Sequence, residues 1–75
     1  MVEVPLSDLS TGKWAKIVMV KGIDLSLVAP LEKSALLAGK NIKLIEKKPN
    51  LIVETENDRL ILDPEFAKLI FVQIP

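Results

Sequence analysis

The chain has 75 residues, contains neither cysteine nor histidine, and carries ten basic and ten acidic side chains, so that its formal net charge is zero. The missing cysteine excludes disulfides and thiolate metal sites, and the missing histidine excludes Ser-His-Asp and Cys-His catalysis. Hydrophobic residues make up 49% of the chain but aromatic residues only 4%, so a core must be built from leucine, isoleucine and valine. A chain of this length is expected to form one domain over residues 1–75.

Charge and hydropathy patterns also limit where the protein acts. The charged residues alternate in short clusters, so no basic stripe indicates nucleic acid binding. No apolar run approaches the roughly 20 residues that cross a bilayer. The opening segment, "MVEVPLSDLS", lacks the charged start and apolar core of a secretion signal. We therefore expect a cytoplasmic protein that does not insert into the membrane.

The first predicted strand is "KWAKIVMVK", which follows the polar turn "DLSTG". Alternate strand residues point to opposite faces. One face is predicted to hold Ala15, Ile17 and Met19. The opposite face is only partly polar, because it would hold Trp14, Lys16, Val18 and Val20.

The segment "IDLSLVAPLEKSALLAGK" departs from this alternation, and its apolar residues are spaced more as in a helix. Pro30 suits the first turn of a helix, and Gly39 suits the left-handed position just beyond a helix end. The pattern predicts one short helix from about Pro30 to Leu37.

Two strands are predicted at 40–48 and 50–56, on either side of the turn-forming pair Pro49-Asn50. A second tight reversal is expected at Asn57-Asp58, through a positive φ or an Asx turn. A further strand would follow, with Leu60 and Leu62 pointing inward.

The sequence Asp63-Pro64-Glu65 has the features of a helix start. Asp63 can cap free amides, Pro64 fits the first helical position, and Glu65 suits the positive end of the helix dipole. One helical turn is expected, followed by a last strand, "IFVQI". Five strands with one helix inserted after the first predict an all-β fold, a small closed or nearly closed barrel.

This arrangement leaves more apolar side chains than one core needs. The residues expected to face inward are Ala15, Ile17, Met19, Ile42, Leu44, Val53, Leu60, Leu62, Ile70 and Val72. Those expected to face outward are Trp14, Val18, Ile61, Leu69 and Phe71. Either the segment 23–31 and the short helix cover the outward group, or the group forms a surface for a partner or for self-association.

Few residues suggest chemistry of their own. Glu54, Glu56 and Asp58 are weak candidates for a hard cation site, although a solvated outer face next to neighbouring basic residues explains them better. We expect no resident metal, cofactor or catalytic group. Lysines 43, 47 and 48 suggest a phosphate contact, but Glu46 lies among them and no aromatic residue is interleaved for base stacking.

Three stretches in order, "LSDLSTGKWAKIVMVKG", "PLEKSALLAGKNIKLIEKKP" and "LILDPEFAKLIFV", resemble the ferrous iron transport protein A (FeoA) family. The residues that carry the resemblance are Leu6, Leu9, Gly12, Ala15, Ile17, Leu31, Leu36, Gly39, Leu62, Ala67, Ile70 and Val72. Together they span nearly the whole chain.

The resemblance implies an SH3-like barrel that acts, without enzymatic activity, as a cytoplasmic accessory of the ferrous iron permease FeoB. The working hypothesis places the docking surface at Trp14, Leu27, Val28, Leu31 and Phe71, and a homo-oligomer is possible. Two alternatives stay open. One is a small nucleic-acid-binding barrel that uses Lys43, Lys47 and Lys48, and the other is a detached repressor-type SH3-like domain that senses a divalent metal.

Overall fold

The computed structural model describes residues 2–22 and 34–74, which form a single six-stranded sheet, two short helices and a short helical segment at residues 34 and 35. The elements in chain order are β1 (Val2–Pro5), the 3-10 helix η1 (Leu6–Asp8), β2 (Trp14–Val20), β3 (Asn41–Glu46), β4 (Leu51–Glu54), β5 (Arg59–Leu62), α2 (Pro64–Ala67) and β6 (Ile70–Ile74).

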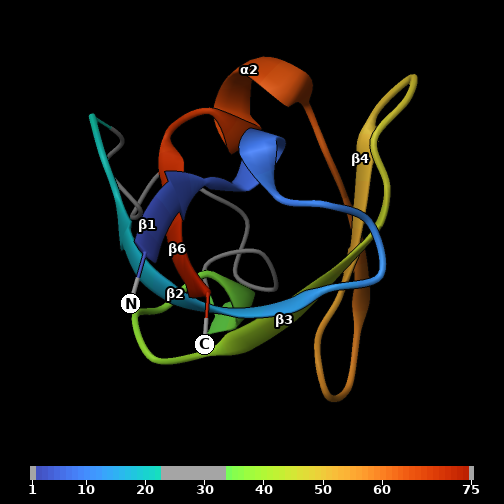
Figure 1. Cartoon of the computed structure of the whole chain (residues 1–75). Coiled ribbons are helices and arrows are strands. Elements are labelled where there is room, and N and C mark those ends of the chain that lie inside the picture. Colours follow the sequence, from blue (N-terminus) through green and yellow to red (C-terminus); the bar gives the residue numbers. More distant parts are fainter. Residues whose placement is uncertain (1, 23–33, 75) are drawn as a thin grey trace.

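All neighbouring strands are antiparallel, in the spatial order β1-β6-β2-β3-β4-β5. The sheet curls around the core, with β1, β6 and β2 on one side, β4 on the other, and α2 across one end (Figure 1). The all-β prediction is confirmed. The closed barrel is not, because β1 and β5 are the two edges of the hydrogen-bonded sheet within the described residues.

Strand β1 was not expected, and it raises the number of strands from five to six. Its four residues include Pro5, which removes an amide donor and makes the segment a poor strand by local pattern. The segment nevertheless forms a strand because it pairs with β6, where Val2 lies opposite Ile74 and Val4 lies opposite Val72.

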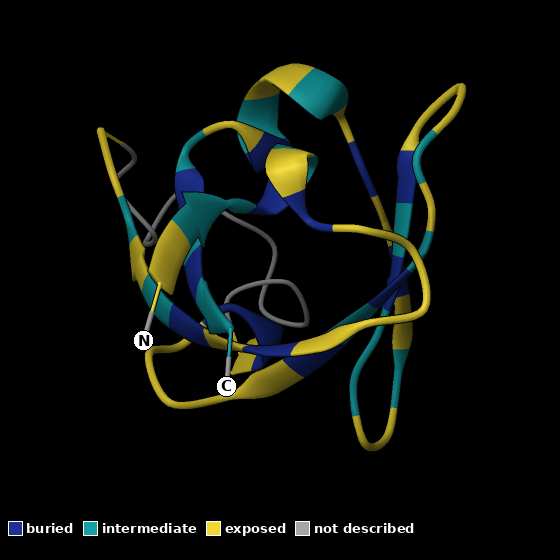
Figure 2. Ribbon diagram, in the orientation of Figure 1, coloured by how far each residue is buried: buried dark blue, intermediate teal, exposed yellow. Residues whose placement is uncertain are grey.

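The core lies on the inner face of the curled sheet and is built from aliphatic side chains. Buried positions fall at alternate residues of strands β2 to β6, as Figure 2 shows along the ribbon. The buried set comprises Leu6, Leu9, Ala15, Ile17, Ala35, Leu36, Ile42, Leu44, Leu51, Val53, Leu60, Leu62, Ala67, Ile70 and Val72. Nine of the ten residues expected to face inward are therefore confirmed.

The exception is Met19, which is 44% exposed. The register between β2 and β6 shifts between Ile17 and Met19, which is the mark of a β-bulge. A bulge adds one residue and so reverses the faces beyond it. Val20 consequently packs against the core, and Met19 points away from it.

The glycine turns form as the sequence predicts. Gly39 has a φ of 91°, the left-handed conformation expected beyond a helix end. Residues 34 and 35 are helical, but Leu36 lies in a turn and Leu37 in a bend, so the helix ends before the predicted Leu37. The predicted part of this helix from Pro30 to residue 33 lies outside the described residues. Gly12, with a φ of 81°, donates its amide to the carbonyl of Leu44 at 2.6 Å and ties the first turn to β3.

The reversal between β4 and β5 forms by a different route from the one expected. No non-glycine residue of the described chain has a positive φ. Instead, the Asp58 amide donates to Oγ1 of Thr55 at 3.0 Å, and the Thr55 amide donates to the Asp58 carbonyl at 2.8 Å. The threonine hydroxyl thus performs the function assigned to the Asx turn.

The predicted helix start at Asp63 is confirmed. Its Oδ1 accepts a hydrogen bond from the Glu65 amide at 2.8 Å, and Pro64 occupies the first turn of α2. In the described part of the chain, no helix has the length and hydropathy required to cross a membrane.

One ion pair links β4 to β5 on the outer side of the sheet. Arg59 lies directly opposite Glu54 and donates a hydrogen bond to its carboxylate. This hydrogen bond, together with the positive charges of Arg59 and Lys43, holds the pKa of Glu54 below its ordinary value, although partial desolvation opposes the effect.

Replacement of Leu44 by alanine tests the aliphatic core. Leu44 is fully buried, so we expect Leu44→Ala to reduce the free energy of unfolding by about 2–5 kcal/mol. Val2→Ala serves as the control because Val2 is 60% exposed, and its effect should stay within about 0.5 kcal/mol. Urea denaturation measures both, and equal losses would contradict this assignment of the core.

An NMR titration of the carboxyl groups tests the Glu54–Arg59 pair. We expect Glu54 to titrate below the ordinary glutamate value and Arg59→Gln to raise its pKa toward that value. Because the pKa is lower in the folded state, the stabilisation is present above the unfolded-state pKa and is lost as the pH falls through the folded-state pKa. Lys68→Gln breaks only the separate pair with Glu65 and should leave Glu54 unchanged.

Candidate functional site

The outer face of the sheet, opposite the core, carries an apolar patch at one end of β2 and β6. The strand registers place Pro5, Phe71 and Met19 side by side across β1, β6 and β2. Met19 is exposed, while Pro5 and Phe71 are half-buried. We call these three residues the Phe71 patch.

A lysine flanks this patch. Nζ of Lys21 lies 4.5 Å from the centroid of the Phe71 ring, within the range of a cation–π interaction. The ammonium group of Lys21 thereby places a positive charge beside the apolar patch. An aromatic centre with a charged margin is the usual anatomy of a protein interface.

Trp14 lies at the opposite end of the same outer face. It is 46% exposed, stands opposite Lys43 on β3, and borders a shallow hollow with Asn41 and Glu56. Trp14 and Met19 are five positions apart along β2, which corresponds to roughly 16 Å in a strand. The structure therefore does not bring Trp14 and Phe71 into contact, although both face outward.

The other predicted docking residues, Leu27, Val28 and Leu31, lie outside the described residues. In the sequence they follow Lys21 and Gly22, at the end of β2 that carries the Phe71 patch. Val18 and Leu69 are half-buried, and Ile61 is the most exposed of the large apolar side chains that were expected to face outward.

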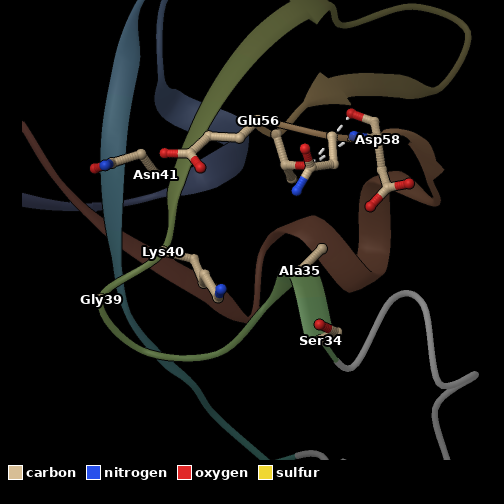
Figure 3. Close-up of a pocket in the computed structure, with 9 residues that line it drawn as sticks. Ser34, Ala35, Gly39, Lys40, Asn41, Glu56 and Asp58 are labelled. Atoms are coloured by element: carbon tan, nitrogen blue, oxygen red, sulfur yellow. Dashed lines mark hydrogen bonds between the residues drawn. The ribbon is translucent and has the colours of Figure 1, made fainter.

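A polar hollow, not foreseen from the sequence, separates the end of the short helix from the β4–β5 turn (Figure 3). Its volume is about 160 Å³. The residues that line it are Ser34, Ala35, Gly39, Lys40, Asn41, Thr55, Glu56, Asn57 and Asp58. No pattern in the sequence indicates this hollow, because its two walls are brought together only by the pairing of β3 with β4.

The acidic residues near this hollow do not converge. In Figure 3 the Glu56 side chain extends toward Asn41, whereas the carboxylate of Asp58 points in another direction. Glu54 is engaged by Arg59. Among residues 2–22 and 34–74, no three acidic, histidine or cysteine side chains are grouped as metal ligands would be. The weak metal candidates Glu54, Glu56 and Asp58 are therefore not assembled into a site.

The three lysines of the nucleic-acid alternative are also distributed over two elements. Lys43 lies on β3 between Trp14 and Glu54 in the strand register. Lys47 and Lys48 follow the end of β3, in the turn that leads to β4. An acidic residue adjoins each end of this set. Glu54 lies opposite Lys43 in the strand register, and Glu46 precedes Lys47 in the chain.

Comparisons with known proteins identify the fold and the family. The FeoA domain model matches residues 4–74. An iron uptake regulatory protein (FeoA) of known crystal structure is 23% identical, with a TM-score of 0.79 over 97% of each chain. The FeoA protein of Chlorobium tepidum is also 23% identical, with a TM-score of 0.79 over 95% of this chain and 70% of that one.

The same fold occurs within longer chains, one of which is a manganese-dependent transcriptional repressor. T. acidophilum IdeR is 20% identical, with a TM-score of 0.84 over 100% of this chain but 35% of its own length. The present chain thus spans about a third of that protein. A search of curated proteins finds no significant match. At these identities the solved structures show the fold alone.

The resemblance deduced from the sequence is confirmed by the family comparison, whose match extends beyond the three stretches quoted above. Because that match covers residues 4–74, almost the entire sequence, the chain belongs to the FeoA domain family.

Proposed function

We propose that this protein is a non-enzymatic, cytoplasmic accessory of ferrous iron uptake that docks onto the cytosolic part of a FeoB-type iron permease. Membership of the FeoA family is the observation that carries the proposal. The composition supports a binding role, since the chain has no histidine or cysteine to act as a proton shuttle, a thiolate nucleophile or a soft metal ligand.

The outer face of the sheet is the surface we assign to docking. A standard interface covers about 800 Å² on each partner, which corresponds to a circle about 32 Å across. The whole protein measures 28 × 26 × 24 Å. A footprint of that size includes both the Phe71 patch and Trp14, despite their separation along β2.

The residue types on this face support the assignment. Tryptophan, phenylalanine and methionine are enriched in interface cores, where charged residues are depleted. Trp14 and Met19 are both more than two-fifths exposed, at 46% and 44%. Leu27, Val28 and Leu31, which lie outside the described residues, are also proposed to take part in docking.

The likeness to metal-dependent regulators favours the alternative of a regulatory SH3-like domain, but only at the level of the fold. A metal-sensing role requires a ligand cluster, and Glu54, Glu56 and Asp58 do not form one. Docking onto a protein requires only the exposed apolar face that the sheet presents. We therefore prefer docking as the function.

Charge substitutions on the outer face test the proposal in a titration against the purified cytosolic part of the permease. We expect Met19→Glu and Trp14→Glu each to weaken binding by at least about tenfold, because a charge in the core of an interface must be desolvated without a partner. Isothermal titration calorimetry measures the affinity, and circular dichroism checks that the variants are folded.

Lys48→Glu is the matched control. Lys48 is exposed in the β3–β4 turn, outside the proposed surface, so its reversal should leave the permease affinity unchanged. The same variant distinguishes the nucleic-acid alternative, which predicts salt-dependent RNA or DNA binding that Lys48→Glu weakens. Normal permease binding by both Met19→Glu and Trp14→Glu would exclude the proposed surface.

A further inference from the structure

The two edges of the sheet differ in how well they are protected against pairing with another strand. At the β1 edge, Pro5 lacks an amide donor. Strand β5, "RLIL", contains no proline and no bulge, and its Ile61 is 65% exposed. The β5 edge is therefore the one suited to accept a further strand.

The hydrogen bonding of the β4–β5 hairpin shows which β5 groups point away from β4, toward the edge that no described strand pairs with. The Thr55 amide bonds to the Asp58 carbonyl, so these opposed residues form a hydrogen-bonded pair. Hydrogen-bonded and non-hydrogen-bonded pairs alternate along an antiparallel ladder. Leu60 and Leu62 consequently bond to β4, whereas Arg59 and Ile61 direct their amides and carbonyls outward.

We propose that two copies of this protein pair through β5, antiparallel, about a two-fold axis at Ile61. In this register Ile61 lies opposite Ile61 of the second copy, and Arg59 lies opposite Asp63 of the second copy. The proposal is independent of docking onto a permease, because it depends only on the edge of the sheet.

The backbone groups fit this register. The outward amide and carbonyl of each Ile61 bond reciprocally across the axis, as in any hydrogen-bonded antiparallel pair. On either side, the Asp63 amide of one copy reaches the Arg59 carbonyl of the other. The Asp63 carbonyl already accepts from the Ala67 amide at 3.0 Å, so the Arg59 amide gains no such bond.

The side chains select this register over its neighbours. Arg59 would lie between Glu54 of its own hairpin and Asp63 of the second copy, two opposite charges. An axis at Arg59 would instead oppose two arginines, and an axis at Leu60 would oppose Arg59 to Ile61. Like charges directly opposite one another destabilise a strand pair.

An apolar row on the outer face also becomes continuous in the dimer. Ile52 of β4 lies opposite Ile61 of β5 in the strand register. Pairing at Ile61 places the Ile52–Ile61 pair of one copy next to the Ile61–Ile52 pair of the second copy. Four isoleucines then lie in one line across the two sheets. The most exposed large apolar side chain of the described residues is thereby covered.

The short edge limits the strength of the dimer. Strand β5 has only four residues, so the contact is smaller than a standard interface. We expect a reversible dimer that forms at concentrations of about 0.01–1 mM.

Sedimentation equilibrium over that range is the test. The wild-type mass should rise from monomer toward dimer. Ile61→Lys, which opposes two ammonium groups at the axis, should weaken the dimer by at least about tenfold. Ile61→Pro removes an amide that β4 does not use, and it should have the same effect. Val2→Lys, at a similarly exposed position on the β1 edge, should leave the dimer intact.

Two results would overturn the proposal. One is a wild-type protein that stays monomeric up to about 1 mM. The other is a dimer that survives both Ile61 substitutions or that Val2→Lys disrupts, since either places the contact elsewhere. Amide chemical shifts recorded across the same series should change with concentration at Arg59 to Asp63 in the wild type only.

Discussion

Burial of aliphatic side chains on the inner face of one curled sheet is the constraint on which the rest of the structure depends. A small domain buries a limited fraction of its surface, so nearly every inward position must be apolar. Here all the strands from β2 to β6 contribute fully buried or nearly buried residues, and η1 adds Leu6. No polar or charged side chain is buried in the described part of the chain.

The need for aliphatic residues at the inward positions explains why the candidate binding residues lie on the outer face of the sheet. Because the interior is filled with leucine, isoleucine and valine, the aromatic residues Trp14 and Phe71 are left on the other side of the sheet. The bulge in β2 adds Met19 to them by reversing the faces after Ile17. A binding surface thus arises from the same strand that forms the centre of the core.

The open form of the sheet has a second consequence. A closed barrel pairs every strand on both sides, whereas an open sheet leaves edges that must be blunted or paired. Pro5 protects the β1 edge against further pairing, whereas β5 contains no proline and its Ile61 is exposed. Trp14, Met19 and Phe71 lie on β2 and β6, whereas the contact between copies is proposed for β5, so the two contacts do not require the same residues.

The sequence by itself determined much of this protein, because alternation, turn residues and a helix cap are local signals. It predicted the inward faces of the strands, the left-handed Gly39 and the cap at Asp63. The family resemblance also followed from it. These features depend on neighbours a few residues apart, where periodicity and backbone preference suffice.

Only the tertiary structure decided the rest. Strand β1 exists because β6, at the far end of the chain, supplies its hydrogen bonds. Met19 turned outward because the pairing of β2 with β6 requires a bulge, and the sheet stayed open because no described strand joins β1 to β5. Glu54, Glu56 and Asp58 do not form a cluster, because Arg59 lies opposite Glu54 and because Thr55 binds the Asp58 amide in the turn. Each of these outcomes depends on long-range pairing, which a pattern of neighbouring residues does not encode.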